Sequence, residues 1–272
     1  MASTIPVARP SVLVVWDFDW SLVNENSDSW VVEQLGEELT PEFRRLQEEE
    51  HLGWTQIMSR QMRSLWEKGV KEDEIKKEMT RLPVFEEMLE AVRSAARAGA
   101  SQAIVSDANK VFIEEFVHHH GIRRLFTKGI STNGGVFTDD GRLDVTPCHE
   151  SSLPPHGCPL CPPNMCKGLI LDGLLSVSPD SDGQDRRAVD KVIYVGDGGG
   201  DYCPALRLKP GDLVLARDGG EDGRLYGLRR RIENEEGGPL ACRLLLWENG
   251  AHVLKAIENE LKEPQTLDTT GQ

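Results

Sequence analysis

The stretch VLVVWDFDWSLVNENSDSW, residues 12–30, decides the fold of this chain. It begins with a run of apolar residues, Val12–Trp16, that is typical of a parallel strand buried on both faces of a sheet. Asp17 and Asp19 follow directly, and open α/β sheets bind ligands beyond the carboxyl ends of their strands. Because side chains alternate along an extended chain, we expect both carboxylates to emerge with the same sense. Their mutual repulsion then requires a positive charge at this edge of the sheet.

The rest of the sequence alternates between short apolar runs and helical patterns. Further strands are predicted at 102–106, 191–195 and 212–215. Apolar residues at helical spacing predict helices at 85–98 and 110–119. Turn signals at Asn133-Gly134 and Asp140-Gly141 predict a β-hairpin around 130–145. This alternation favours an α/β fold built on a parallel sheet.

Residues 29–82 interrupt the alternation, because they have the pattern of one helix after another. In 54–69, for example, apolar residues recur on one helical face before a terminal glycine. A helical block between the first two strands predicts a cap inserted into the α/β domain. The core is then expected to comprise residues 11–28 and 83–262, with a flexible tail at 263–272.

Composition and charge disfavour several classes of partner. Of the 272 residues, 39% are hydrophobic, which suffices for one sizeable core. The net charge of −14 disfavours nucleic acid, because binding a phosphate backbone needs a basic surface. No apolar run approaches the roughly 20 residues of a membrane span, and residues 1–11 lack the pattern of a secretion signal. We therefore expect a cytoplasmic protein with reduced cysteines and with neither a membrane nor a nucleic-acid partner.

Three further motifs place phosphate-binding or cation-binding groups near strand ends. Ser106 in SDAN ends the second strand, where a hydroxyl and the N–H groups of a following helix form a phosphate site. Lys167 in NMCKG begins a helical run and could neutralise both Asp17 and phosphate oxygens. Asp197 and Asp201 in YVGDGGGD follow the third strand, and carboxylates there are natural ligands for Mg²⁺. Each motif alone is also typical of a turn or a helix cap, whereas all of them in this order indicate phosphoryl transfer.

These motifs resemble those of the haloacid dehalogenase superfamily of phosphohydrolases. The matching segments are DFDWS, IVSDAN, Lys167 and GDGGGD. The longer strings ENSDSW, HGCPLCPPNMCKG and GDGGGDYCP resemble the phosphoethanolamine/phosphocholine phosphatase branch. That branch includes plant relatives acting on pyrophosphate or thiamine monophosphate and a vertebrate pyridoxal phosphate phosphatase. The resemblance covers residues 12 to about 208 and implies a Rossmann-like parallel sheet core with an inserted helical cap.

The resemblance also implies a division of labour among the aspartates. Asp17 would be the nucleophile that forms a phosphoaspartyl intermediate, and Asp19 would be the general acid/base. Mg²⁺ would be held by the Asp17 carboxylate, the backbone carbonyl of Asp19 and Asp197. Asp201 would support this metal site.

The remaining roles concern the substrate. Ser106 would grip the phosphoryl group, and Lys167 would balance its charge. In the amino-alcohol phosphatases, acidic residues at the positions of Asp28 and Asp107 face the ammonium group of the substrate, which has a clear electrostatic rationale. For Asp107, an acid in the first turn of a helix is an equal alternative. Trp20 stands where relatives carry a charged or polar residue, and it could narrow the pocket or cover the loop.

Cysteines are concentrated in the segment 148–166. Cys148, Cys158, Cys161 and Cys166 offer the ligand type of a tetrahedral zinc site, with Cys158 and Cys161 in C-x₂-C spacing. A second C-x₂-C pair is missing, however, and Cys166 adjoins Lys167. Reduced thiols packed in a loop, or a redox-sensitive disulfide, are the alternatives.

Taken together, the sequence predicts a Mg²⁺-dependent phosphatase, a phosphoric monoester hydrolase, acting on a small phosphorylated metabolite such as phosphocholine or phosphoethanolamine. One alternative changes the substrate to inorganic pyrophosphate or thiamine monophosphate. Another alternative is a catalytically silent binding protein, although such a protein has no physical need for this arrangement of charges. A dehalogenase is disfavoured, because halide displacement does not require the acid at Asp19.

Overall fold

The computed structural model describes residues 10–49, 52–149, 156–176, 189–219 and 223–262. The tail expected at 263–272 lies outside these residues. In the described part, the strands form one seven-stranded sheet in the order β4-β3-β2-β1-β5-β6-β7. The strands are β1 (Val12–Trp16), β2 (Ser101–Asn109), β3 (Ile130–Phe137), β4 (Leu143–Thr146), β5 (Lys191–Gly196), β6 (Leu213–Arg217) and β7 (Arg243–Trp247).

Six of these strands pair in parallel, and only β4 in the described sheet is antiparallel, in a hairpin with β3. The predicted α/β fold with a parallel sheet is therefore confirmed, as is the hairpin. Strand β1 lies between β2 and β5. The strands β2 to β4 extend the sheet on one side of β1, and the strands β5 to β7 extend it on the other. Ligands of such sheets bind at the carboxyl edge of this switch point.

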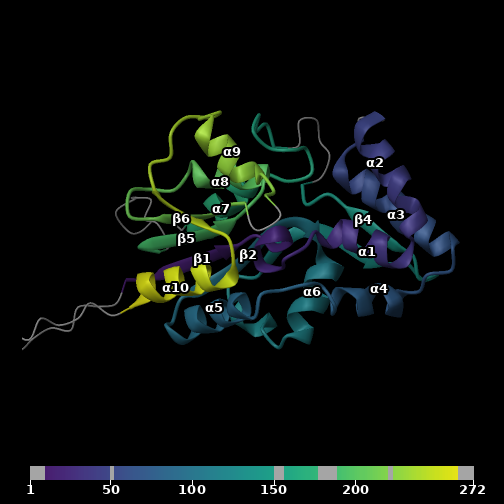
Figure 1. Cartoon of the computed structure of the whole chain (residues 1–272), viewed down its shortest axis with the longest axis horizontal. Coiled ribbons are helices and arrows are strands. Elements are labelled where there is room, and N and C mark those ends of the chain that lie inside the picture. Colours follow the sequence, from purple (N-terminus) through teal and green to yellow (C-terminus); the bar gives the residue numbers. More distant parts are fainter. Residues whose placement is uncertain (1–9, 50–51, 150–155, 177–188, 220–222, 263–272) are drawn as a thin grey trace, which may run out of the picture.

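Helices cover both faces of the sheet (Figure 1). They are α1 (Ser27–Leu35), α2 (Thr40–Glu49), α3 (Trp54–Glu67), α4 (Glu72–Met79), α5 (Glu86–Arg97), α6 (Lys110–His119), α7 (Lys167–Leu175), α8 (Tyr202–Ala205), α9 (Gly227–Glu233) and α10 (Gly250–Leu261). Helices α5, α6 and α10 lie on one face, and α7, α8 and α9 lie on the other. Helices α1 to α4 gather in the right half of Figure 1, beyond the central strands of the sheet.

The alternation of side chains along β1 explains why this strand is apolar throughout. Val14 and Trp16 pack into the core shared with α5, α6 and α10, whereas Leu13 and Val15 pack toward α7, α8 and α9. Both faces exclude water, so each side chain contributes to stability through the burial of apolar surface. The indole N–H of Trp16 donates to Oε1 of Gln102 at 2.9 Å, so the buried polar group of this strand is also satisfied.

The helices between β1 and β2 extend the hydrophobic core that α5, α6 and α10 share with the sheet. Met58, Met62 and Leu65 on α3 are fully buried, as their helical spacing indicates. Helix α3 also attaches to the β3–β4 hairpin, because the Ser59 hydroxyl donates to the Val145 carbonyl at 2.7 Å and the Trp66 indole donates to the Asp140 carbonyl at 2.9 Å. The helical block is thus held at the edge of the sheet by side-chain hydrogen bonds as well as by apolar contacts.

One sequence prediction about an element is corrected, and one strand was not predicted. The second strand does not end at Ser106 but continues to Asn109, which is the N-cap of α6 and accepts hydrogen bonds from the Val111 and Phe112 N–H groups. Ser106 and Asp107 are therefore strand residues and do not begin a helix. The sequence analysis also did not predict β7, an edge strand whose leucines are partly exposed. Among the described residues, no helix has the length and apolar character needed to cross a bilayer.

Candidate active site

A buried group of charged side chains lies at the carboxyl edge of the sheet. The carboxylates of Asp17, Asp197 and Asp201 approach one another so that oxygens from all three lie within 4.8 Å. The Lys167 ammonium joins them, with Nζ 2.7 Å from Asp17 Oδ2 and 2.9 Å from Asp201 Oδ1. None of the four residues is more than 8% exposed. Residues from the end of β1, the loop after β5 and the start of α7 thus converge as the motifs predict.

The chain turns sharply after β1, and this turn orients Asp17. The Asp17 N–H donates to the Val195 carbonyl of β5 at 2.9 Å, and Asp17 Oδ1 accepts from the Phe18 N–H at 2.7 Å. A single wide helical turn over Phe18–Leu22 follows, closed by a hydrogen bond from the Leu22 N–H to the Asp17 carbonyl. Trp20 within this turn has a φ of 54°, which is uncommon for a residue other than glycine.

Asp201 organises the glycine-rich loop after β5. Its Oδ2 accepts from the N–H groups of Asp197 and Gly198, at 3.1 and 2.9 Å, and its Oδ1 also accepts from the Tyr194 hydroxyl at 2.8 Å. A Cβ atom at Gly196 would lie only 2.6 Å from Cγ of Asp201, so this position requires glycine. With both of its oxygens engaged inside the protein, Asp201 fixes the loop that presents Asp197.

Ser21 is the residue of the turn that contacts Asp197. Its hydroxyl donates to Asp197 Oδ1 at 3.1 Å, and the Ser21 side chain is buried. The Ser21 hydroxyl group therefore links the turn after β1 to the loop after β5.

The electrostatics of this group favour a bound cation. Burial raises the pKa of Asp17 well above its usual value, and the negative charge of Asp201 adds to this effect while Lys167 opposes it. Burial and Asp201 likewise raise the pKa of Asp197 to about 8. Burial lowers the pKa of Lys167, but Asp17 and Asp201 outweigh it and raise this pKa overall, so the ammonium stays charged. Three carboxylates around one ammonium leave an excess of negative charge that fits a divalent cation with oxygen ligands.

The carboxylate of Asp19 does not join this group. Its Oδ1 accepts from the Ser27 N–H at 2.8 Å, at the start of α1. Burial, followed by the nearby negative charge of Asp28, raises the pKa of Asp19 well above its usual value. The turn after β1 thus directs the carboxylate of Asp19 toward α1, whereas that of Asp17 faces Lys167, and the pair does not share one partner.

Asp28 and Asp107 lie on the same side of the site as Asp19. Asp28 is 2% exposed; its Oδ2 accepts from the Trp54 indole, and the Asn109 side chain also interacts with its carboxylate. Burial raises the pKa of Asp28 to about 7. Asp107 Oδ1 is 3.9 Å from Lys167 Nζ, and its side chain is 44% exposed. The structure thus places these two carboxylates between the helical block and the sheet, next to the catalytic motifs.

Ser106 lies at the same edge of the sheet. It follows Ile104, which pairs with Trp16 of β1, by two residues, and it is fully buried. Its hydroxyl accepts from the Ala108 N–H at 3.3 Å within the extended end of β2. The N–H groups that surround Ser106 therefore belong to a strand end, whereas the sequence analysis expected the first turn of a helix.

Arg217 is a residue of this region that the sequence analysis missed. It ends β6, is 4% exposed, and donates through Nη1 to the Trp20 carbonyl at 2.6 Å and through Nη2 to Asn24. Trp20 itself packs against Arg224, whose guanidinium lies 3.8 Å from the ring centroid, and against the Tyr226 ring. Trp20 therefore connects the turn after β1 to the segment that follows β6. The available signal for Arg217 was an arginine at the end of an apolar strand.

The cysteines form a second cluster. Cys158, Cys161 and Cys166 lie together, but the fourth member is Cys203 from α8, and Cys148 is not part of the group. The Cys148 N–H instead donates to Asn133 Oδ1 at 3.0 Å. The zinc set expected from the sequence is thus corrected at one position, because local spacing carries no information about Cys203.

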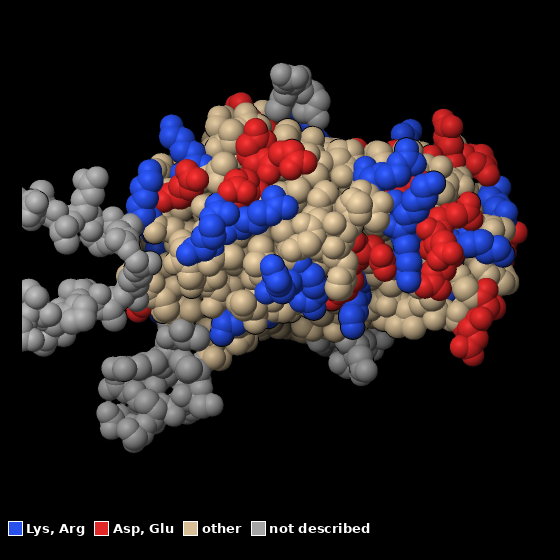
Figure 2. All heavy atoms as spheres, turned by 90° about the horizontal axis from the view of Figure 1, so that it is seen from below, with Lys and Arg blue, Asp and Glu red and all other residues tan. Residues whose placement is uncertain are grey.

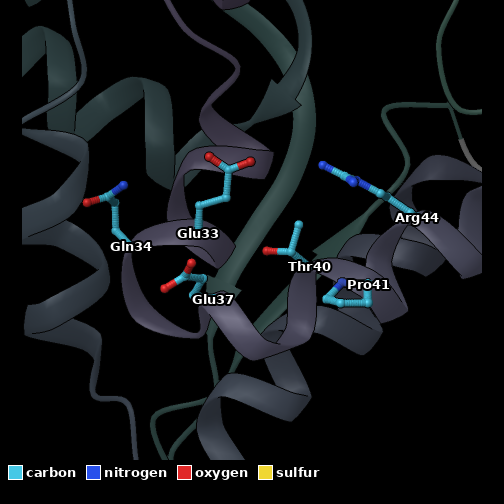
Figure 3. Close-up of a pocket in the computed structure, with 6 residues that line it drawn as sticks. All are labelled: Glu33, Gln34, Glu37, Thr40, Pro41 and Arg44. Carbon is cyan, nitrogen blue, oxygen red and sulfur yellow. The ribbon is translucent and has the colours of Figure 1, made fainter.

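A separate hollow of about 850 Å³ lies on the helical block (Figure 3). Glu33 of α1 and Arg44 of α2 point toward the space between these helices, and Glu37 and Thr40 complete much of its wall. None of the carboxylates of Asp17, Asp197 and Asp201 lines this hollow. It is therefore distinct from the candidate active site.

Comparison with known proteins agrees with the geometry. The chain is 41% identical to inorganic pyrophosphatase 2 of Arabidopsis thaliana, over 76% of this chain and 71% of that protein. It is 41% identical to a thiamine phosphate phosphatase-like protein of the same plant, over 76% of this chain and 80% of that protein. It is 31% identical to a pyridoxal phosphate phosphatase of Rattus norvegicus, over 91% of this chain and 97% of the relative.

Among solved structures, a substrate-bound phosphoserine phosphatase has the same fold, with a TM-score of 0.53 and 17% identity over 92% of this chain and 99% of that one. The model of the family described as Putative Phosphatase matches residues 12–261, which is nearly the whole described chain. The chain therefore belongs to the Putative Phosphatase family, a group of phosphatases with the haloacid dehalogenase fold.

Proposed function

We propose that this protein is a Mg²⁺-dependent phosphatase that hydrolyses a small phosphorylated metabolite through a phosphoaspartyl intermediate on Asp17. The observation that supports this proposal is the convergence of Asp17, Lys167, Asp197 and Asp201 in one buried group at the end of β1. Because the buried carboxylates outnumber the ammonium, the group has an electrostatic need for a cation, and its oxygen donors suit Mg²⁺.

In the proposed reaction, a carboxylate oxygen of Asp17 attacks phosphorus, and the bond from phosphorus to the leaving oxygen breaks. Asp19 donates its proton to that leaving oxygen, which its raised pKa allows at neutral pH. In the second half, Asp19 takes a proton from a water molecule whose oxygen attacks phosphorus. The bond between phosphorus and the Asp17 oxygen breaks, so phosphate leaves and the Asp17 carboxylate is regenerated.

The other residues bind and neutralise the phosphoryl group. Lys167, already in contact with Asp17, compensates the negative charge of the phosphoryl oxygens, and Ser106 offers a hydroxyl at the neighbouring strand end. Asp17, Asp197 and the backbone carbonyl of Asp19 would hold Mg²⁺, which supplies charge neutralisation at the transferring group. Asp201 positions Asp197 through the backbone hydrogen bonds of the loop.

We propose a substrate that carries a positive charge near its phosphate, as phosphocholine and phosphoethanolamine do. Asp28 and Asp107 support this choice, because both carboxylates lie close enough to Asp19 to act on its charge, and Asp107 is also near Lys167. Pyrophosphate, thiamine monophosphate and pyridoxal phosphate are alternatives, since the names of the relatives point to these compounds.

The test is phosphate release by the purified full chain on all five of these compounds, with Mg²⁺ and with excess chelator. We expect turnover only with Mg²⁺, a preference for an amino-alcohol phosphate, and complete loss with Asp17→Asn. Asp139→Asn, at an exposed position of the hairpin, is the matched control and should retain activity. Activity that survives Asp17→Asn would exclude Asp17 as nucleophile, and absence of turnover on any phosphate ester would favour a silent binding protein.

The setting of this activity is also a proposal. We infer a cytoplasmic protein, since all six cysteines are free in the structure. Figure 2 shows basic and acidic side chains interspersed on one face, which does not offer the continuous basic surface that nucleic acid requires. We accordingly propose small metabolites as the partners, with neither nucleic acid nor membrane.

A further inference from the structure

Four cysteine sulfurs from three segments of the chain converge next to the acidic group. The sulfurs of Cys158, Cys161, Cys166 and Cys203 all lie within 4.8 Å of one another. Cys158 and Cys161 belong to the loop before α7, Cys166 is the N-cap of α7, and Cys203 lies in α8. Cys166 and Cys203 are buried, and the other two are partly buried.

The separation of the sulfurs matches a tetrahedral metal site. Zinc–sulfur bonds of about 2.3 Å in a regular tetrahedron place the sulfurs roughly 3.8 Å apart. Cys203 Sγ lies 3.7 Å from Cys158 Sγ and 3.8 Å from Cys166 Sγ. These separations are far longer than the roughly 2 Å of a sulfur–sulfur bond. We propose that Cys158, Cys161, Cys166 and Cys203 bind one zinc ion as a structural site with four thiolate ligands.

The surroundings of the cluster fit this assignment. A Cβ atom at Gly168 would lie 2.6 Å from Cys203 Sγ and 2.3 Å from Arg207 Nε, so glycine makes room for both groups. The Arg207 guanidinium is thereby held close to the sulfurs, where positive charge favours thiolates. Cys166 lies at the N-terminus of α7, where the partial positive charge of the helix dipole also favours a thiolate.

His156 and Cys148 do not join the cluster. His156 accepts from the Cys158 N–H through Nδ1 at 3.1 Å, and its Nε2 lies 2.9 Å from the Pro162 carbonyl oxygen. Cys148 lies outside the cluster. The described residues therefore offer four sulfur ligands and no position open for substrate, which is the pattern of a structural zinc site and differs from that of a catalytic one.

The zinc ion would hold together two segments that carry catalytic groups. Cys166 directly precedes Lys167, and Cys203 follows Asp201 by two residues. Lys167 Nζ and Asp201 Oδ1 are 2.9 Å apart. A metal that joins the starts of α7 and α8 would thus fix the distance between these two side chains. The proposed zinc site affects stability and metal content, and it does not depend on which phosphate ester the enzyme accepts.

The experiment measures zinc in the full chain purified under reducing conditions and exchanged into buffer that contains Mg²⁺. We expect about one zinc per chain in the wild type. Cys161→Ser should lose the zinc, whereas Cys148→Ser and Cys242→Ser, which change cysteines outside the cluster, should retain it. X-ray absorption of the wild type should show four sulfur neighbours at about 2.3 Å.

A second measurement covers the case in which Cys161→Ser does not fold. Wild-type protein from cells grown with cobalt in place of zinc should show, in its absorption spectrum, the intense charge-transfer and visible bands of a tetrahedral cobalt–thiolate complex. The proposal is overturned if the wild type binds neither zinc nor cobalt in this way, if folded Cys161→Ser keeps its zinc, or if peptide mapping finds a disulfide within the cluster.

Discussion

Asp28 is a carboxylate whose burial is costly to the folded protein. It lies in the first turn of α1, is 2% exposed, and has its pKa raised from 3.8 to about 7, chiefly by burial. A group with a raised pKa in the folded state contributes most to stability when it is protonated. This contribution is fully present below pH 3.8 and is lost as the pH rises through about 7.

We therefore expect Asp28→Asn to stabilise the protein at pH 8 and to have little effect at pH 4. Because Asn is neutral at every pH, the gap between variant and wild type should widen by up to roughly 1.4 kcal/mol per pH unit across that window. Urea denaturation without Mg²⁺ or substrate measures this gap, and Asp139→Asn is the control. Parallel stability profiles for Asp28→Asn and wild type would contradict the prediction.

The same substitution separates stability from function. If Asp28 receives an ammonium group, Asp28→Asn should raise KM for phosphocholine by about tenfold or more and leave KM for pyrophosphate nearly unchanged. The loss of one partly buried charge contact of about 1.5–3 kcal/mol has this size. A stabilised variant with an unchanged KM for both compounds would show that Asp28 does not face the substrate.

Individual residues of the site differ in how far the sequence reveals them. Asp17, Asp197 and Lys167 each stand in a motif beside a strand or helix end, so local pattern suffices to find them. Arg217 and Cys203 act through partners distant in the chain, namely Trp20 and Cys166. Only the fold brings these pairs together. Cys203 stands in the string GDGGGDYCP, but nothing in that string relates it to Cys166.

Gly196 ties the geometry of β5 to that of the loop that follows it. Its missing side chain leaves the space that Asp201 occupies, and Asp201 in turn accepts the backbone hydrogen bonds that shape the loop. We expect Gly196→Ala to displace Asp201, to cost about 1–3 kcal/mol of stability and to reduce kcat strongly.

A matched glycine provides the control for this prediction. A Cβ atom at Gly173 on α7 would meet no other atom within 4 Å, so Gly173→Ala should be neutral or slightly stabilising through its helix propensity. Thermal melts and phosphate release measured on both variants test the contrast. Equal behaviour of the two alanine variants would show that Asp201 can move without consequence.

Among the secondary-structure elements, β1 was predicted with its observed bounds, because a continuous apolar run has one simple interpretation. The end of β2 at Asn109 was not predicted. There, the Asn133 amide donates to the Asp107 carbonyl at 2.6 Å and the Thr132 hydroxyl donates to the Ala108 carbonyl at 2.9 Å. Side chains from β3 thus keep this segment extended, and such tertiary hydrogen bonds override the local signal for a helix start.

The molecule as a whole should depend on a divalent cation for part of its stability. The excess of buried carboxylates over the Lys167 ammonium is unfavourable without one. We expect Mg²⁺ to raise the melting temperature, with a stabilisation of about 2.7 kcal/mol at a hundred times its dissociation constant. Asp197→Asn should remove this effect, and NaCl of equal ionic strength is the control. An equal shift in Asp197→Asn would place the stabilising ion elsewhere.

The central place of β1 has a consequence for biosynthesis. Strand β1 pairs with β5, which is translated much later, and the Ser11 N–H donates to the Asp190 carboxylate, 179 positions away, at 2.7 Å. A nascent chain that has emerged only as far as the cysteine segment carries Asp17 but not Asp197 or Asp201. The buried acidic group can therefore assemble only after translation has passed Asp201, and a shorter nascent chain lacks two of its three carboxylates.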